Sequence, residues 1–302
     1  MDSEDFLKAE TRSEFYVDEK RKKLWKIELD MLEIVQEICK KNSINYFLHS
    51  GSALGAVRHN GFIPWDDDLD LGMLRNDFQR FVSACEKELK PPFFLQYGLN
   101  DGGHVCGLLR IRNSNTTAII RNDEDKDCNN GVYLEIYPFD NIPDALIPRK
   151  IQFFLSLFFY HGLLANYYGP ASKRQWFARI VIQLLGSQKA FSIWQKICQK
   201  YNNRNTKYID TVSLPDYARK GIYRIKCNWI HRFKEVPYEY LTVSIPESVD
   251  AMLKLNYGNY WELPKPEERG IEHTNIVFFD PDKPYSYYKD SDLVHEYFHG
   301  NN

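Results

Sequence analysis

The sequence predicts a fold that combines helices and strands, α/β (α+β), with a mixed sheet and helices in the N-terminal half and a mainly helical C-terminal half. Short strand-like runs alternate with helical patterns up to Pro143, and helical periodicity dominates after it. The chain has 302 residues, of which 43% are hydrophobic and 26% charged, and no internal repeat is evident. This length and composition fit one large globular domain or two moderate ones.

Apolar spacing and turn residues predict the elements of the front half. Residues 1–17 are interpreted as a polar leader, which lacks the apolar segment of a secretory signal. Apolar residues at helical spacing predict an amphipathic helix over 18–41. The elements expected next are a strand over 44–49, a short helix from Gly51 to about His59, a strand over 69–74, a helix over 76–89, and short strands over 93–97, 107–112, 117–121 and 132–137.

The back half, over 148–302, is predicted to be mainly helical, and Pro148 marks its boundary with a core over 18–147. Helices are expected near 147–166, 173–186 and 190–203. The apolar run 151–165 is interrupted by polar residues and is shorter than the roughly 20 residues that span a bilayer. We expect a buried helix there, and a helix lying on a membrane surface is the alternative.

The charge distribution excludes a general nucleic-acid-binding surface, because the formal net charge is −2. The stretch from Lys200 to Lys234 nevertheless holds nine Lys or Arg against two Asp, with aromatic residues between them. Our first interpretation is a solvated helical face. The alternative is a surface for an anionic partner, such as a phosphorylated glycan, a nucleotide or a lipid headgroup.

The six cysteines are widely scattered and form no C-x-x-C pair. This spacing argues against a zinc site and against a disulfide framework, and it fits a reducing compartment. We therefore expect a cytoplasmic protein, with peripheral contact to the inner face of the membrane left open.

The segment Trp65-Asp-Asp-Asp-Leu-Asp-Leu71 places four carboxylates within five positions. Such crowding is unfavourable unless a cation lies among the carboxylates. If the segment is an extended strand, Asp66, Asp68 and Asp70 share one face and the leucines point into the core. Oxygen ligands on one face suit a hard divalent cation, so we expect Mg²⁺ or Mn²⁺.

Gly51 and Ser52 lie between a predicted strand and a predicted helix, some 15 residues before the aspartates. A glycine there lets a phosphate approach free backbone N–H groups at the positive end of the helix. A Gly-Ser pair followed by Asp-x-Asp is the arrangement of nucleotidyltransferase folds, in which a metal and the backbone hold a di- or triphosphate.

A third carboxylate is expected from a neighbouring strand, in Gly131–Asp140. Glu135 is preferred to Asp140 because a carboxylate within an apolar strand needs a partner, and its alternative role is a buried ion pair with an arginine. Arg58 and Arg110 are the expected phosphate-binding cations, since each lies beside the proposed phosphate site.

The block "GSALGAVRHNGFIPWDDDLDLG" over 51–72 closely resembles the LicD family, which has a nucleotidyltransferase-like core and includes fukutin and fukutin-related protein as distant relatives. The segments "LLRIRNSNTTAII", "GVYLEIYPFD" and "LKLNYGNYWELPKP" resemble further motifs of that family, and the likeness extends from about Leu24 to Pro266.

The resemblance implies metal ligation by Asp68 and Asp70 together with Asp66 and Glu135. It implies that Gly51 and Ser52 hold the donor phosphates, and that the segment from Tyr257 to Pro264 completes the site. The pocket residues expected on this basis are Trp65, Tyr257 and Trp261. The chain departs from the family pattern at Ser52, where Thr is common, at His49, where the family is usually acidic or small, and at Glu135, where Asp is frequent.

The activity implied by the resemblance is transfer of a phospho-alcohol from a CDP-alcohol to a hydroxyl of a glycan or lipid-linked oligosaccharide, with release of CMP. Phosphorylcholine is the first expectation, and ribitol, glycerol and ethanolamine stay open. The products would belong to a lipopolysaccharide, a teichoic acid or a capsule. Two alternatives remain: a nucleotidyltransferase that releases pyrophosphate, and a non-catalytic glycan-binding relative, which the intact aspartate set disfavours.

Overall fold

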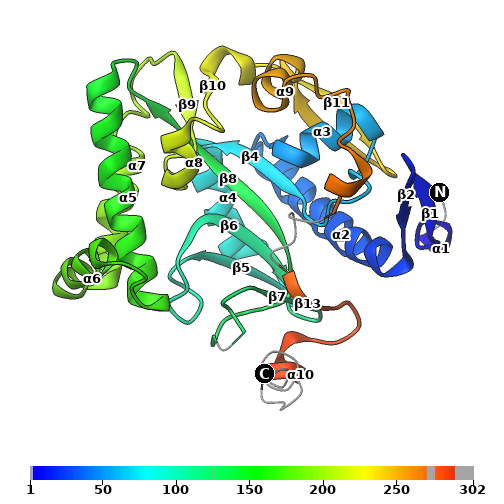
Figure 1. Cartoon of the computed structure of the whole chain (residues 1–302), viewed down its shortest axis with the longest axis horizontal. Helices are drawn as coiled ribbons and strands as arrows, with labels where there is room; N and C mark the ends of the chain where they lie inside the picture. The colour runs from blue at the N-terminus through cyan, green and yellow to red at the C-terminus, as the bar shows by residue number, and fades with distance from the viewer. Residues whose placement is uncertain (1–2, 125, 271–275, 290–302) are drawn as a thin grey trace.

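The computed structural model describes residues 3–124, 126–270 and 276–289 (Figure 1). Its central feature is a mixed sheet that runs in the order β10-β9-β8-β4-β3, with β6 also paired to β8 and β5 paired to β6. Among the described residues this sheet has seven strands: β3 Phe47–Leu48, β4 Asp70–Leu74, β5 Phe93–Gly98, β6 Cys106–Asn113, β8 Val132–Ile142, β9 Tyr208–Asp210 and β10 Ile225–Lys226.

The register of this sheet places three predicted site residues in one row. Strand β4 runs parallel to β8 with Asp70 opposite Glu135, and β6 runs antiparallel to β8 with Arg110 opposite the same glutamate. Directly paired residues of neighbouring strands project to the same face of a sheet. Asp70, Glu135 and Arg110 therefore meet on one face.

The helices of the front half pack against this sheet. Helix α2 (Glu19–Asn42) begins after Asp18, whose side chain caps it by accepting a hydrogen bond from Arg21 N, and it ends at Ser43 in the left-handed conformation. Helix α3 (Ser50–His59) connects β3 to the segment before β4, and α4 (Arg75–Glu88) follows β4. Buried apolar residues of all three helices belong to one core with the sheet.

The helices of the back half gather at one side of the molecule (Figure 1), where α5 (Leu146–Tyr168), α6 (Lys173–Leu185) and α7 (Ser187–Cys198) share a second core. The remaining elements are α1 Ser3–Phe6, β1 Glu10–Arg12, β2 Phe15–Val17, β7 Thr117–Ile120, α8 Pro215–Lys220, η1 Cys227–Ile230, β11 Phe233–Tyr238, β12 Leu241–Pro246, α9 Val249–Tyr257, η2 Pro266–Glu268, β13 Ile276–Asp280 and α10 Tyr285–Lys289.

The predicted fold class is confirmed: the protein is a mixed α/β structure around a mixed sheet. Several expectations need correction. The strand expected over 44–49 is only β3, and the helix expected over 190–203 ends at Cys198. The back half also contributes strands, because β9 pairs with β8, so the central sheet continues past residue 148.

Two further segments differ from their predicted character. In the segment predicted as a polar leader, β1 and β2 form a hairpin, and Phe6 and Val17 are buried, because both side chains join the main core. The basic stretch after Lys200 is not one helical face, since it contains β9, α8, β10 and η1 in succession.

Helix α5 is buried on one face only. Phe153 and Leu163 lie in the core, whereas Ile151 and Phe154 are exposed. The expectation of a buried helix is therefore correct for one face of α5 and wrong for the other. Among the described residues, no helix has both the length and the apolar character needed to cross a membrane. The six cysteines are all free, and five of them are buried.

Candidate active site

A cavity of about 1030 Å³ opens where α3, the start of β4 and the strands β6 and β8 meet. Residues of α8 and of the segment from Tyr257 to Glu268 close its other side. All four aspartates of the acidic segment line it, together with Glu135. The topology thus brings residues from distant parts of the chain to one space.

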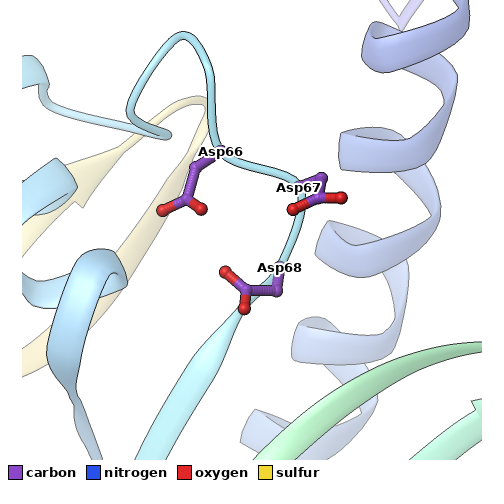
Figure 2. A group of neighbouring side chains, drawn as sticks. All are labelled: Asp66, Asp67 and Asp68. Atoms are coloured by element: carbon purple, nitrogen blue, oxygen red, sulfur yellow. The ribbon is translucent and has the colours of Figure 1, made fainter. Parts of the chain in front are cut away.

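Three consecutive carboxylates converge in this cavity from the loop that leads into β4 (Figure 2). Asp66, Asp67 and Asp68 each offer an oxygen within 4.8 Å of the others, which is a spacing that can hold a metal ion. The strand begins only at Asp70, so the alternation expected over 66–71 is wrong for residues 66–69. An irregular loop lets neighbouring side chains converge, and sequence reasoning missed Asp67 for this reason.

Helix α2 fixes the backbone of this loop. The carbonyl oxygen of Asp66 accepts hydrogen bonds from Arg21 Nη1 at 2.8 Å and from Trp25 Nε1 at 3.0 Å. The indole of Trp25 is fully buried and stacks on Phe62 with ring centroids 4.8 Å apart. The loop is held by contacts that leave its carboxylates facing the cavity.

The carboxylates of the cluster destabilise one another's charged forms. Burial and the neighbouring Asp66, Asp70, Asp67 and Glu135 raise the pKa of Asp68 well above its ordinary value. Burial, Glu135 and Asp66 raise the pKa of Asp70 in the same way, and Asp70 Oδ1 has no hydrogen-bond partner among the described residues. A cation among these oxygens would instead stabilise the charged forms of the carboxylates.

A further carboxylate, that of Glu28 on α2, interacts electrostatically with the aspartate cluster. It is 1% exposed, and burial followed by the charges of Asp67, Asp66 and Asp70 raises its pKa well above the ordinary value. No pattern in the sequence distinguished Glu28 from the other buried positions of the helix. The carboxylate of Glu28 therefore adds to the crowding of acidic groups around the aspartates.

The N-terminus of α3 faces the aspartates. A Cβ atom on Gly51 would lie 2.7 Å from Asp66 Oδ2, so the absence of a side chain allows the helix and the carboxylate to approach. Ser52 is buried, and its Oγ accepts a hydrogen bond from Asp70 N at 2.8 Å, which fixes the start of β4. The first-turn N–H groups have no intrahelical partner and carry the positive end of the helix dipole.

His49, which precedes this helix, is neutral. It is 2% exposed, with Phe139 and Tyr223 rings centred 5.0 and 4.6 Å away. Burial lowers the pKa of His49 to about 3. The departure from the family pattern at this position therefore adds no charge to the cavity.

Glu135 is held by two neighbours. Its Oε1 lies 2.7 Å from both Nε and Nη2 of Arg110, and its Oε2 accepts a hydrogen bond from Tyr137 Oη at 2.8 Å. The ion pair considered for Glu135 is thus present, and its partner is the arginine expected to bind phosphate. Both Arg110 and Glu135 still line the cavity.

Asp140, the less favoured carboxylate, lies outside the cavity lining. Its oxygens are 2.8 and 2.5 Å from Nε and Nη2 of Arg75, and Asn202 donates to it at 2.7 Å. Both members of this pair are buried. Asp140 is a structural residue at the end of β8.

The remaining predicted residues divide between the cavity and the surface. Arg58 lines the cavity and donates hydrogen bonds to Tyr260 O at 2.8 Å and to His59 Nε2 at 2.9 Å. Trp65 and Tyr257 also line it, whereas Trp261 is 58% exposed and does not. The structure therefore corrects the expected place of Trp261, and the chemical roles of the others stay predictions.

Comparison with known proteins places this geometry in a family. Residues 43–160, which carry α3, β4, β6 and β8, match the family described as LicD/FKTN/FKRP, nucleotidyltransferase domain. These residues form a LicD domain. The resemblance stated from the motifs is confirmed.

Two relatives illustrate the range of the family. The chain is 25% identical over 264 residues to the lipopolysaccharide cholinephosphotransferase LicD of Haemophilus influenzae, covering 83% of this chain and 94% of that protein. It is 48% identical over 44 residues to the human ribitol 5-phosphate transferase FKRP, covering 15% of this chain and 8% of that protein. These similarities support phosphotransfer as the general reaction.

An aromatic wall of tyrosines also lines the active-site cavity. It comprises Tyr133, Tyr137, Tyr160, Tyr217 and Tyr223. Tyr217 and Tyr223, which lie outside residues 43–160, stack with ring centroids 5.3 Å apart. Sequence reasoning noted these two tyrosines only as aromatics within the basic stretch, because nothing in their spacing indicates which way they point.

Carboxylates outnumber cations among the charged groups that line the active-site cavity. Among the described residues, the lining holds carboxylates of Asp66, Asp67, Asp68, Asp70, Glu135, Glu262 and Glu268 against the cations Arg58, Arg110 and Lys265. A phosphate compound alone would meet net repulsion here. The carboxylate oxygens near α3 are the residues that could hold a divalent cation.

Proposed function

We propose that this protein is a metal-dependent transferase that moves a phospho-alcohol, phosphorylcholine in the first place, from a CDP-alcohol to a hydroxyl of a cell-surface glycan precursor and releases CMP. The observation that carries the proposal is the carboxylate cluster beside the N-terminus of α3 at one cavity. This pairing offers both a cation site and an anion site to one diphosphate. The cytoplasm is the proposed location, since all cysteines are free.

Asp68 and Asp70 would hold the cation, Mg²⁺ or Mn²⁺, with Asp66 and Glu135 beside them. The buried Asp70 Oδ1, which has no hydrogen-bond partner within the described part of the chain, and the raised pKa of Asp68 both suit such a group. When bound, the cation supplies neutralisation of phosphate charge. We add Asp67 to this set because one of its carboxylate oxygens lies within 4.8 Å of oxygens of Asp66 and Asp68.

The residues of the chain would position the donor and receive the proton. N–H groups of Gly51 and Ser52 would bind the diphosphate, and Arg58 would neutralise it. The acceptor hydroxyl oxygen forms a bond to the phosphorus that bears the alcohol, and the bond from that phosphorus to the CMP oxygen breaks. CMP leaves with the electron pair, and the hydroxyl proton passes to Asp66 or Glu135. Positioning and charge neutralisation supply most of the rate enhancement in such transfers.

The aromatic wall favours choline among the alcohols. A quaternary ammonium is attracted to aromatic faces, and desolvated contacts of this kind contribute about 2 kcal/mol. Ribitol and glycerol would instead require hydrogen-bonding groups, which the tyrosine hydroxyls offer and the ring faces do not. The relative from Haemophilus influenzae, named a cholinephosphotransferase, supports the same choice.

Arg58→Ala is expected to raise the donor KM about tenfold or more, because a charge-assisted contact to phosphate is lost, while kcat changes less. Steady-state kinetics with CDP-choline measures this. Arg80→Ala on α4, which removes an exposed arginine paired with Asp77, is the matched control. An unchanged KM for the Arg58 variant would remove Arg58 from the donor site.

Tyr217→Leu is expected to weaken CDP-choline binding about tenfold and to leave CDP-ribitol binding nearly unchanged, because only the cationic alcohol uses the ring face. Tyr217→Phe keeps that face and should retain most of the affinity. Tyr16→Leu removes an exposed tyrosine that does not line the cavity and serves as a control. Equal losses for both donors would show that Tyr217 does not recognise choline.

Product identity tests the proposed reaction. Purified protein is incubated with Mg²⁺, a glycan acceptor and either CDP-choline, CDP-ribitol or CTP, and the released nucleotides are separated. We expect CMP from CDP-choline and none without metal. Pyrophosphate from CTP would instead support the nucleotidyltransferase alternative, in which the α-phosphorus is attacked.

A further inference from the structure

A second cavity, of about 760 Å³, lies on the outer side of α5, between that helix, α6 and α8. Its apolar lining comes largely from aromatic rings, including Phe153, Phe154, Phe158 and Phe177. Over the residues that the structure describes, it shares no lining residue with the active-site cavity. The proposed transferase mechanism makes no use of it.

Large apolar side chains are exposed on α5 and α6, the two helices that supply most of this lining. Ile147 and Phe154 on α5 are 73% and 65% exposed, and Trp176, Phe177 and Leu184 on α6 are 56%, 59% and 83% exposed. These two helices pair as a hairpin at one side of the molecule (Figure 1). A soluble surface rarely gathers so many large apolar groups on two adjacent helices unless another surface covers them.

Cations surround the same apolar groups. The cavity lining includes Arg149, Lys150, Arg174, Arg219 and Arg224, and no Asp or Glu of the described residues belongs to it. Of these five, only Arg224 forms an ion pair within the described part of the chain, with Asp210 at 3.4 Å. The face formed by α5 and α6, with the adjoining Arg219, thus combines exposed rings with four cations that form no ion pair among the described residues.

This face lies directly behind the wall of the active-site cavity. Tyr160 lines the active-site cavity, and the next residue of α5, His161, lines the second cavity. On α8, Tyr217 lines the first and Arg219 the second. A surface that covers the outer side of α5 and α8 would therefore lie one helix away from the reacting groups.

We propose that the α5–α6 face binds the surface of a membrane that contains anionic phospholipids. The exposed rings and leucines would enter the boundary between headgroups and acyl chains, and the arginines and Lys150 would contact lipid phosphates. This arrangement would hold the active-site cavity next to acceptors carried by a membrane lipid. Binding to lipid does not depend on the transferase reaction and is tested without it.

Charge argues against a second copy of the chain as the occupant of this face. A two-fold symmetric contact brings the same surface patch of each copy together. The unneutralised cations of one copy would then oppose those of the other, which costs free energy in a desolvated interface. An anionic lipid surface has the complementary charge.

Co-sedimentation with vesicles tests the proposal. The full chain is mixed with vesicles of phosphatidylcholine alone or of equal parts phosphatidylcholine and phosphatidylglycerol, and the bound fraction is measured against lipid concentration. We expect binding to the anionic vesicles and little to the neutral ones. Arg149→Ala with Arg174→Ala should weaken binding about thirtyfold, and Phe154→Glu with Phe177→Glu should weaken it at least as much.

Controls separate this face from general effects. Leu255→Glu introduces one charge at an exposed apolar residue of α9, away from the cavity lining, and should leave binding unchanged. Circular dichroism melting curves establish that each variant folds, and Phe154 and Phe177 are both exposed in the wild type. Three results would overturn the proposal: no binding to anionic vesicles, binding that the phenylalanine variants retain, or gel filtration in which a concentration-dependent dimer is lost in the phenylalanine variants.

Discussion

Asp68→Asn and Asp70→Asn should each reduce CMP release from CDP-choline at least about a thousandfold, because each removes a charged oxygen ligand from the proposed cation site. The loss should persist at saturating donor, since the reaction itself requires the cation. CMP release is measured with Mg²⁺ in excess. Near-normal turnover of either variant would refute the metal assignment.

The same variants have a stability readout that distinguishes lost chemistry from lost folding. In the metal-free protein, Asp68→Asn removes one of several crowded carboxylates, so its melting temperature should equal or exceed that of the wild type. Mg²⁺ should raise the melting temperature of the wild type and not that of the variant. Asp30→Asn changes an aspartate of α2 outside the cluster and should preserve the Mg²⁺ response. A destabilised Asp68→Asn protein would contradict this account of the cluster.

The raised pKa values of Asp68 and Asp70 also fix the sign of a pH effect. Above the ordinary Asp pKa of about 3.9, the native metal-free protein keeps protons that the unfolded chain has released. Its stability therefore falls as the pH rises from that value through the raised values. The stabilisation by Mg²⁺ should accordingly be larger at about pH 7 than at about pH 5.

Arg75→Ala is expected to have the largest effect on stability. It leaves the fully buried carboxylate of Asp140 without its cation, which costs about 3–5 kcal/mol. The melting temperature should fall by roughly 10 °C for a chain of this size. Differential scanning calorimetry measures the change, and Arg80→Ala, at an exposed ion pair of α4, should change it little.

A double variant separates a structural pair from a catalytic carboxylate. Arg75→Met combined with Asp140→Leu removes both charges and should recover most of the lost stability, because no unpaired charge remains buried. The Mg²⁺ response of the double variant should match that of the wild type. A lost Mg²⁺ response would instead place Asp140 in the cation site, in place of Glu135.

The sequence was most informative where local chemistry is unusual. Four aspartates within five residues indicated a cation site, and all four line one cavity. Gly51 was expected beside them, and the 2.7 Å between its would-be Cβ and Asp66 Oδ2 gives the physical reason for a glycine there. The fold class followed from periodicity because the front half alternates strands and helices.

The sequence did not allow prediction of the register between distant strands or of the irregular backbone of the acidic loop. The pair between Arg110 and Glu135 depends on the alignment of β6 with β8, which no local pattern specifies. Asp67 lies close to Asp66 and Asp68 in an irregular loop whose backbone α2 holds through its bonds to Asp66 O. Residues far apart along the chain form the aromatic wall, and their common orientation arises only in the folded molecule.

Calorimetric titration of CDP-choline in the presence and absence of Mg²⁺ tests the central claim most directly. The wild type should bind CDP-choline more tightly than CTP or ATP, only with Mg²⁺, and Asp70→Asn should lose this binding. Tighter binding of a triphosphate, or binding of CDP-choline that is independent of both the metal and Asp70, would contradict the proposed CDP-alcohol transferase.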